Sequence, residues 1–192
     1  YCGKEIMNLE YIYRQMVRVL HGDIICINEE GKIEACYGDM AALGNPLFTD
    51  PEFLADICNR KIRDYPEIFC ENDTIFYAVI SLNDRFSNSV GRKIIVGPVS
   101  VEKRTKASEH YLMEHHRISE TTGFRLSFCE LKVFGSGVLM LYHMITGKEM
   151  TLNDLWQKNG IQETDIIEVK GQVSSTIFER QEQELPHNPY DQ

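Results

Sequence analysis

The segment EHYLMEHH, residues 109–116, contains the side chains best suited to bind a metal ion or transfer a proton. Two histidines that bind one zinc ion from a helix usually stand four residues apart, because that spacing places both on one face. His115 and His116 instead follow His110 by five and six residues. This spacing favours polar surface residues, and we expect no metal site. His143 lies in the apolar segment LYHMI, which is typical of a core or interface histidine.

The sequence also offers little for nucleophilic or phosphate chemistry. Gly135-Ser136-Gly137 superficially resembles a nucleophile elbow, which requires a sharp turn from a strand into a helix. The segment lies instead within apolar sequence typical of a helix, where small residues permit another element to approach closely. Gly91-Arg92-Lys93 and Gly147-Lys148 lack the further glycines of a phosphate-binding loop. We therefore expect neither an enzyme nor a bound cofactor.

The composition of the chain argues against further classes of function. The 192 residues are 43% hydrophobic, which is enough for one sizeable core, and the formal net charge is −9. A nucleic-acid-binding domain carries a basic face, so we expect this chain itself to bind no nucleic acid. There is no apolar run of about 18 residues and no apolar N-terminal leader, which predicts a cytoplasmic protein without a membrane segment. The six cysteines lie mostly in apolar runs, which predicts buried free thiols and not disulfides.

Hydrophobic periodicity and turn residues predict the elements that would position any site. Asp50-Pro51 begins a helix with a carboxylate cap, and Ser127 with Glu130, like Thr151 with Asp154, has the spacing of a capping box. The predicted helices and helical segments are residues 5–20, 39–64, 105–117, 128–145, a short helix after Thr151, and 165–183. The predicted strands are 23–28, 32–37, 67–71, 74–81 and 92–97.

These elements predict an α/β (α+β) fold that is similar to the PAS and GAF sensor folds. Tight hairpin turns require antiparallel pairing, so the five strands form one antiparallel sheet flanked by helices, with further helices towards the C-terminus. Strand 74–81 is apolar at both odd and even positions and is expected near the sheet centre, covered on both faces. Helices 5–20 and 128–145 would cover one face. Segment 39–64 would cover the other and leave room for a cavity.

The predicted organisation suggests two ways in which the chain could act. Residues 1–163 would form the sensor domain, 164–184 a signalling or dimerisation helix, and 185–192 a linker to a missing DNA-binding domain. A small-molecule effector would lie against aromatic side chains, although an ordinary core role is favoured for each of them taken singly: Tyr37, Phe69, Phe76, Tyr77 and Tyr111. A homodimer would use a seam on the last helix: Ile166, Val169, Val173 and Ile177.

The dimerisation helix has an alternative interpretation. Gly171 lies inside it and costs about 1 kcal/mol relative to alanine, and a helix of this length is too short to hold a dimer by itself. Packing of this helix on its own sheet explains the same apolar pattern. The sequence therefore leaves an effector-binding domain and a ligand-free dimerisation module both open.

Three segments resemble the N-terminal sensor domain of AraC-family transcriptional regulators of the Firmicutes type. They are EIFCENDTIFYAVISL followed by KIIVGPVS, then FRLSFCELKVFGSGVLMLYHMITGKEMTLNDLW, and the tail ERQEQELPHNPYDQ. The resemblance implies a domain that senses an effector or dimerises, while a C-terminal pair of helix-turn-helix motifs binds the promoter. It assigns no ligand residues. The input domain of a kinase or cyclase is another interpretation, which Pro186 and Pro189 disfavour because they interrupt a helical linker.

Overall fold

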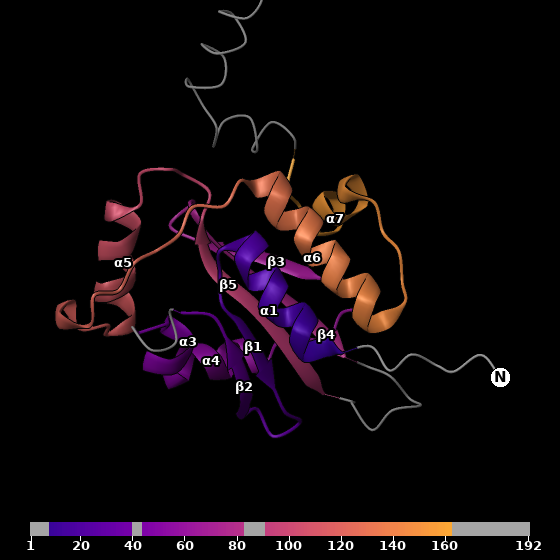
Figure 1. Ribbon diagram of the computed structural model, residues 1–192, viewed down its shortest axis with the longest axis horizontal. Coiled ribbons are helices and arrows are strands. Elements are labelled where there is room, and N and C mark those ends of the chain that lie inside the picture. The colour runs from indigo at the N-terminus through magenta and orange to yellow at the C-terminus, as the bar shows by residue number, and fades with distance from the viewer. Residues whose placement is uncertain (1–7, 40–43, 83–90, 163–192) are drawn as a thin grey trace, which may run out of the picture.

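The computed structural model describes residues 8–39, 44–82 and 91–162, and their elements form a sheet with helices on both faces (Figure 1). The strands are β1 (Ile24–Ile27), β2 (Ile33–Tyr37), β3 (Glu67–Glu71), β4 (Ile75–Leu82) and β5 (Arg92–Ser100). The helices are α1 (Leu9–Leu20), α3 (Pro46–Thr49), α4 (Pro51–Cys58), α5 (Lys106–His116), the 3₁₀ turn η1 (Glu120–Thr122), α6 (Leu131–Thr146) and α7 (Leu152–Lys158).

All pairings in the sheet are antiparallel, and the strand order is β2-β1-β5-β4-β3. The prediction of a five-stranded antiparallel sheet flanked by helices is thereby confirmed. Asn72 and Asp73, which turn β3 into β4, have φ values of 49° and 61°. This left-handed conformation is the one that a tight hairpin turn requires and that Asn and Asp tolerate best.

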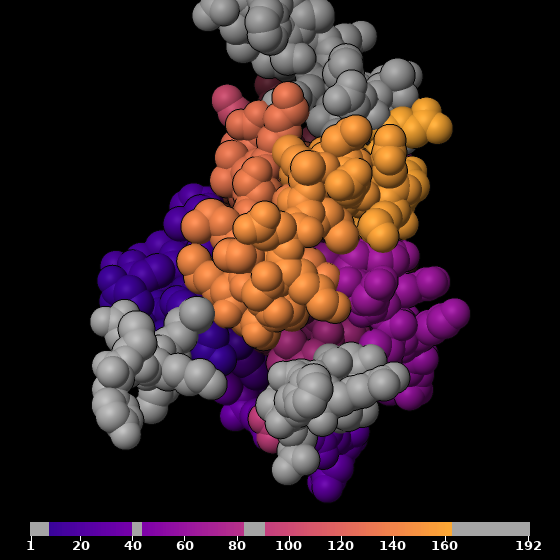
Figure 2. All heavy atoms as spheres, turned by 90° about the vertical axis from the view of Figure 1, so that its right-hand side faces the viewer, coloured from indigo at the N-terminus to yellow at the C-terminus, as the bar shows by residue number. Residues whose placement is uncertain are grey.

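Helices α1 and α6 lie side by side on one face of the sheet (Figure 1), and the atoms of α6 and α7 form a continuous orange surface on this side of the molecule (Figure 2). The core beneath them includes Phe76 and Ile80 of β4. The helices approach closely at Gly137, where an added Cβ would lie 2.2 Å from Leu20 Cδ2. The small residues of the Gly-Ser-Gly segment therefore serve packing, as predicted.

The short helices α3 and α4 and the longer α5 cover the opposite face; we call these three helices the covering layer. Ile75, Tyr77 and Val79 of β4 point towards it, because alternate residues of a strand face opposite sides. Strand β4 is thus buried on both faces, as its sequence predicts. Asp50 caps α4 by accepting a hydrogen bond from Phe53 N at 3.1 Å.

Asn45, at the start of the covering layer, is fully buried and joins three segments. Its side-chain amide donates to Asp23 Oδ2 at 2.9 Å and to the Gly97 carbonyl at 3.1 Å, and its Oδ1 accepts from Leu47 N at 2.9 Å. The same side chain therefore caps α3 and ties it to Asp23, just before β1, and to Gly97 of β5.

The predicted start of the long helix is wrong. Helix α6 begins at Leu131, with Glu130 as an N-cap that makes no side-chain capping bond, so Ser127 and Glu130 form no capping box. Residues 127–129 instead extend along the end of β5, because Ser100 N donates to Ser127 O and Cys129 N donates to Ser100 O, both at 2.8 Å. These backbone bonds hold residues 127–129 out of the helix. The cap at Thr151 forms as predicted, with a hydrogen bond from Asp154 N at 3.1 Å.

Several predictions concern residues outside the described ranges. The 165–183 helix with Ile166, Val169, Val173 and Ile177 belongs to these, as does the 185–192 linker. Among the described residues, no helix is both long enough and apolar enough to cross a membrane. The described cysteines, Cys26, Cys36, Cys58, Cys70 and Cys129, are free.

Candidate functional site

The five aromatic residues predicted to line an effector cavity lie on two different faces of the sheet. Tyr37 and Phe76 pack under α1 and α6. Phe69 and Tyr77 lie on the opposite face, under the covering layer, and Tyr111 of α5 packs against the same cluster from within that layer. Phe76 and Tyr77 are neighbours on one strand, so the pleat alone sends their side chains in opposite directions. The structure therefore brings three of the five together and leaves two on the far side.

The three aromatics on the covering-layer side belong to a closely packed cluster. Phe69 and Tyr77 face each other across β3 and β4, with stacked rings whose centroids are 5.0 Å apart. Phe53 of α4 meets the Tyr77 ring edge-on at 5.4 Å. This packing is the core role that sequence analysis left open for these residues.

A buried ionic bridge lies next to this aromatic cluster. His116, the last residue of α5, has a side chain only 6% exposed, and both of its ring nitrogens meet carboxylates. Nδ1 is 2.9 Å from Asp50 Oδ2, and Nε2 is 2.7 Å from Glu71 Oε2. Where both carboxylates are ionised, each nitrogen must carry a proton to donate to its carboxylate, and the ring is then an imidazolium. We call Asp50, His116 and Glu71 the histidine bridge.

The charges in the histidine bridge stabilise one another. Burial by itself opposes the charged form of His116, but the hydrogen bonds to Glu71 and Asp50 outweigh it and raise the pKa of the imidazole above its ordinary value. Burial likewise opposes the charged form of Asp50, yet the bonds from His116 and from Phe53 N lower the pKa of that carboxyl. The position of His116 at the C-terminal end of α5 also favours a cation.

Two oxygens beside the histidine bridge have unused hydrogen-bonding capacity. Glu71 Oε1 and Tyr77 Oη are buried, and neither makes a hydrogen bond of ordinary geometry among the described residues, although the Tyr77 hydroxyl and the Glu71 carboxylate lie close enough to interact with each other. Burial, and then the charge of the nearby Glu71 carboxylate, raise the pKa of Tyr77 well above its ordinary value, so the hydroxyl keeps its proton. A buried polar group without a partner costs about 1–3 kcal/mol, and proteins usually satisfy such groups with water or a ligand.

The hydrogen bonds of His116 limit the proton chemistry that this arrangement can perform. Because both ring nitrogens of His116 donate to carboxylates, the imidazole has no free lone pair with which to accept a substrate proton. Two properties of this arrangement can change: the charge of the His116 imidazole, and the groups that bond to Glu71 Oε1 and Tyr77 Oη. In the described part of the chain, no group of three His, Cys, Asp or Glu side chains is arranged to hold a metal ion.

Sequence analysis missed His116 by placing it among surface residues. His110 does lie on the surface, where it pairs with Glu114 at 3.0 Å and its side chain is 65% exposed. His116, however, follows the fully buried Leu112 by four residues and so shares its helix face. That spacing was the available signal.

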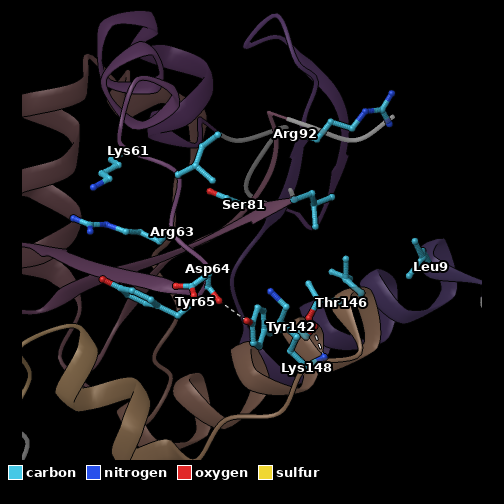
Figure 3. A pocket seen from close by; sticks show the side chains of 13 residues that line it. Leu9, Lys61, Arg63, Asp64, Tyr65, Ser81, Arg92, Tyr142, Thr146 and Lys148 are labelled. Atoms are coloured by element: carbon cyan, nitrogen blue, oxygen red, sulfur yellow. Dashed lines mark hydrogen bonds between the residues drawn. The ribbon is translucent and has the colours of Figure 1, made fainter. Parts of the chain in front are cut away.

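A large open groove lies elsewhere, with a volume of about 740 Å³, between residues 61–65, the ends of β4 and β5, and the C-terminal end of α6 (Figure 3). Its wall is held by a hydrogen bond from Tyr142 Oη to the Asp64 carbonyl. Figure 3 shows Lys61 and Arg63 extending to one side and Arg92 to the opposite side. Because these cations diverge, they form no common binding point for an anion.

Comparison with known proteins finds no matching family model, no matching curated protein and no matching solved structure. The function is therefore inferred from the residues and their geometry.

Proposed function

We propose that this chain is a non-catalytic input domain of an AraC-type transcriptional regulator, in which the covering layer responds to a small-molecule effector. The observation that carries the proposal is the histidine bridge with its two unsatisfied oxygens, Glu71 Oε1 and Tyr77 Oη, buried between the sheet and the covering layer. The resemblance of residues 67–100, 124–156 and 179–192 to AraC-family sensor domains supports the class of output.

The histidine bridge joins three elements, two of which, α4 and β3, also meet in the aromatic cluster through Phe53 and Phe69. Asp50 caps α4, Glu71 ends β3, and His116 ends α5. Thr49 Oγ1 also donates to the His116 carbonyl at 2.7 Å, which ties α3 to the same point. A change at this one histidine would therefore loosen the attachment of all three covering helices, as a switch element requires.

An effector would act by preferring one arrangement of this layer. A small polar molecule that bonded Tyr77 Oη and Glu71 Oε1 would complete the hydrogen bonding of both oxygens, and its binding energy would favour the arrangement that admits it. Because the net charge is −9, phosphates of promoter DNA would be repelled by this chain, and a separate domain would have to bind the promoter. The chain would relay the change in the covering layer to that domain.

The experiment combines a metabolite screen with hydrogen exchange. A ligand at a hundredfold excess over its Kd stabilises the fold by about 2.7 kcal/mol, which a thermal-shift screen detects. We expect such a compound to slow amide exchange in α4 and α5 and, in the full-length regulator, to change the affinity for promoter DNA.

The control variants separate the histidine bridge from general effects. His116→Gln should abolish the response of α4 and α5, whereas His110→Gln, at an exposed position of the same helix, should leave it intact. A full-length protein without affinity for DNA would refute the regulator assignment. A ligand whose effect on α4 and α5 survives in His116→Gln would refute the role of the bridge.

A further inference from the structure

Lys93 is a buried lysine without a carboxylate partner among the described residues. It lies opposite Ser81 in the β4–β5 ladder, is 4% exposed, and donates to Ser81 Oγ at 3.3 Å. Lysine is almost never fully buried unless it is paired, because an uncompensated charge is costly to remove from water. An ammonium has three N–H donors, so the contact with Ser81 leaves two of them for another group.

This lysine lines a cleft of about 240 Å³ at the C-terminal end of α4. A cleft of this size can hold a small metabolite. The cleft lies between the β1–β2 turn, α4 and the start of β5, and is lined by Ile27, Asn28, Glu29, Glu30, Gly31, Ala55, Cys58, Asn59, Gly91 and Lys93. Burial raises the pKa of Cys58, so that thiol adds no charge to the wall.

The charge in the cleft changes sign from the floor to the rim. Glu29 and Glu30 have side chains that are 51% and 72% exposed, in contrast to the buried Lys93. Their ion pairs with Arg92 and Lys32 are long, at 3.7 and 3.6 Å, and such exposed pairs hold their partners weakly. Both carboxylates are therefore available to a cation at the mouth of the cleft.

Asn28 adds hydrogen-bond donors between these charges. Its Oδ1 accepts from Glu30 N at 3.0 Å and from Lys32 N at 2.9 Å, which fixes the side chain within the β1–β2 turn. Its amide NH₂ makes no hydrogen bond to the residues that the structure describes, and Asn28 lines the cleft. A carboxylate in the cleft would thus have a cation and neutral donors within the same wall.

We propose that this cleft binds small zwitterions of the amino-acid class, with the ligand carboxylate on Lys93 and its ammonium at Glu29 and Glu30. A simple anion would satisfy Lys93 but would be repelled by the two rim carboxylates. A simple cation would be attracted by these carboxylates but repelled by Lys93. A zwitterion complements both ends. This inference goes beyond the proposed function, because it assigns a ligand class to a different site. Binding at Lys93 can also be measured without any DNA-binding partner.

The test measures binding of each proteinogenic L-amino acid by thermal shift and calorimetry at low salt. Each is compared with the matched carboxylic acid that lacks the amino group, such as propionate for L-alanine. We expect at least one amino acid to bind about tenfold or more tightly than its matched acid, a difference of about 1.4 kcal/mol. We also expect its affinity to fall as salt screens the charges.

Variants locate the binding. Lys93→Met removes the ammonium with little change in size and should abolish binding while leaving the melting temperature unchanged or higher, since the substitution removes a buried charge that has no carboxylate partner in the described part of the chain. Lys132→Met on the exposed side of α6 is the matched control and should bind normally. Glu29→Gln should reduce the preference for the amino acid over the matched acid. Failure of every amino acid to bind, equal affinity for the matched acids, or binding that survives Lys93→Met would each overturn the proposal.

Discussion

Replacing His116 by glutamine tests how much the histidine bridge contributes to stability. The substitution removes the cation and leaves Asp50 and Glu71, with side chains 23% and 15% exposed, facing a neutral group. Removing one partner of a buried ion pair costs about 3–5 kcal/mol. We expect about 3 kcal/mol, the low end, because the glutamine amide can still donate to one carboxylate and Asp50 retains some water contact.

The cost should depend on pH with a sign that follows from the pKa shifts. The pKa of His116 is raised, so its contribution is complete below the ordinary value of 6.5 and is lost as pH rises through the folded-state value. The pKa of Asp50 is lowered, so its contribution is present above the ordinary value of 3.8 and is lost as pH falls through its folded-state value. The stability difference between the two proteins should therefore be greatest between these two ordinary values.

Urea unfolding of the wild type and of His116→Gln, from about pH 5 to about pH 9, measures this difference. The gap should be largest at the acidic end and shrink towards the alkaline end. His110→Gln, at an exposed position, should change stability by less than about 0.5 kcal/mol at every pH. If the difference in unfolding free energy between the wild type and His116→Gln stayed constant across this pH range, the imidazole would not be charged in the fold. That result would refute the reasoning.

Three further substitutions, one of them with a control variant, test the packing around the sheet. Tyr77→Phe removes a buried hydroxyl that makes no hydrogen bond of ordinary geometry among the described residues and should leave the unfolding free energy unchanged or raise it by about 1 kcal/mol; a clear loss would show that the hydroxyl is bonded in solution. Gly135→Ala would place a Cβ 2.6 Å from Trp156 Cη2 and should cost about 1–3 kcal/mol with a change in the fluorescence of this single tryptophan. Gly123→Ala meets no atom within 4 Å and should leave that fluorescence unchanged, so equal spectral effects would contradict the packing. Asn45→Ala breaks three buried hydrogen bonds and should lower the unfolding free energy by about 3 kcal/mol in a thermal melt, whereas a near-neutral result would show that these bonds do not form.

Local patterns were sufficient to predict the sheet and most of its connections. Strand-like apolar runs on either side of the Asn72-Asp73 turn defined the β3–β4 hairpin, and Asp50-Pro51 defined the start of α4, because these signals act between residues only a few positions apart. The apolar character of β4 at odd and even positions likewise predicted burial on both faces. Composition supported a single core of this size.

The same local signals failed wherever a distant segment competed. Ser127 and Glu130 have the spacing of a capping box, yet the backbone of residues 127–129 bonds Ser100 instead, and the helix begins later. Aromatic type alone could not tell which side of the sheet a residue would face. Phe76 and Tyr77 were therefore predicted to share a cavity although the pleat separates them.

What the sequence by itself determined is the set of strands, turns and amphipathic helices, since each depends on neighbours along the chain. Only the tertiary structure decided that His116 meets Asp50 and Glu71, which stand 66 and 45 positions away, and that Lys93 is buried at the floor of a cleft. Such meetings depend on strand order and on which face each helix covers. Those follow from the packing of the whole core, and no short window of residue types encodes them.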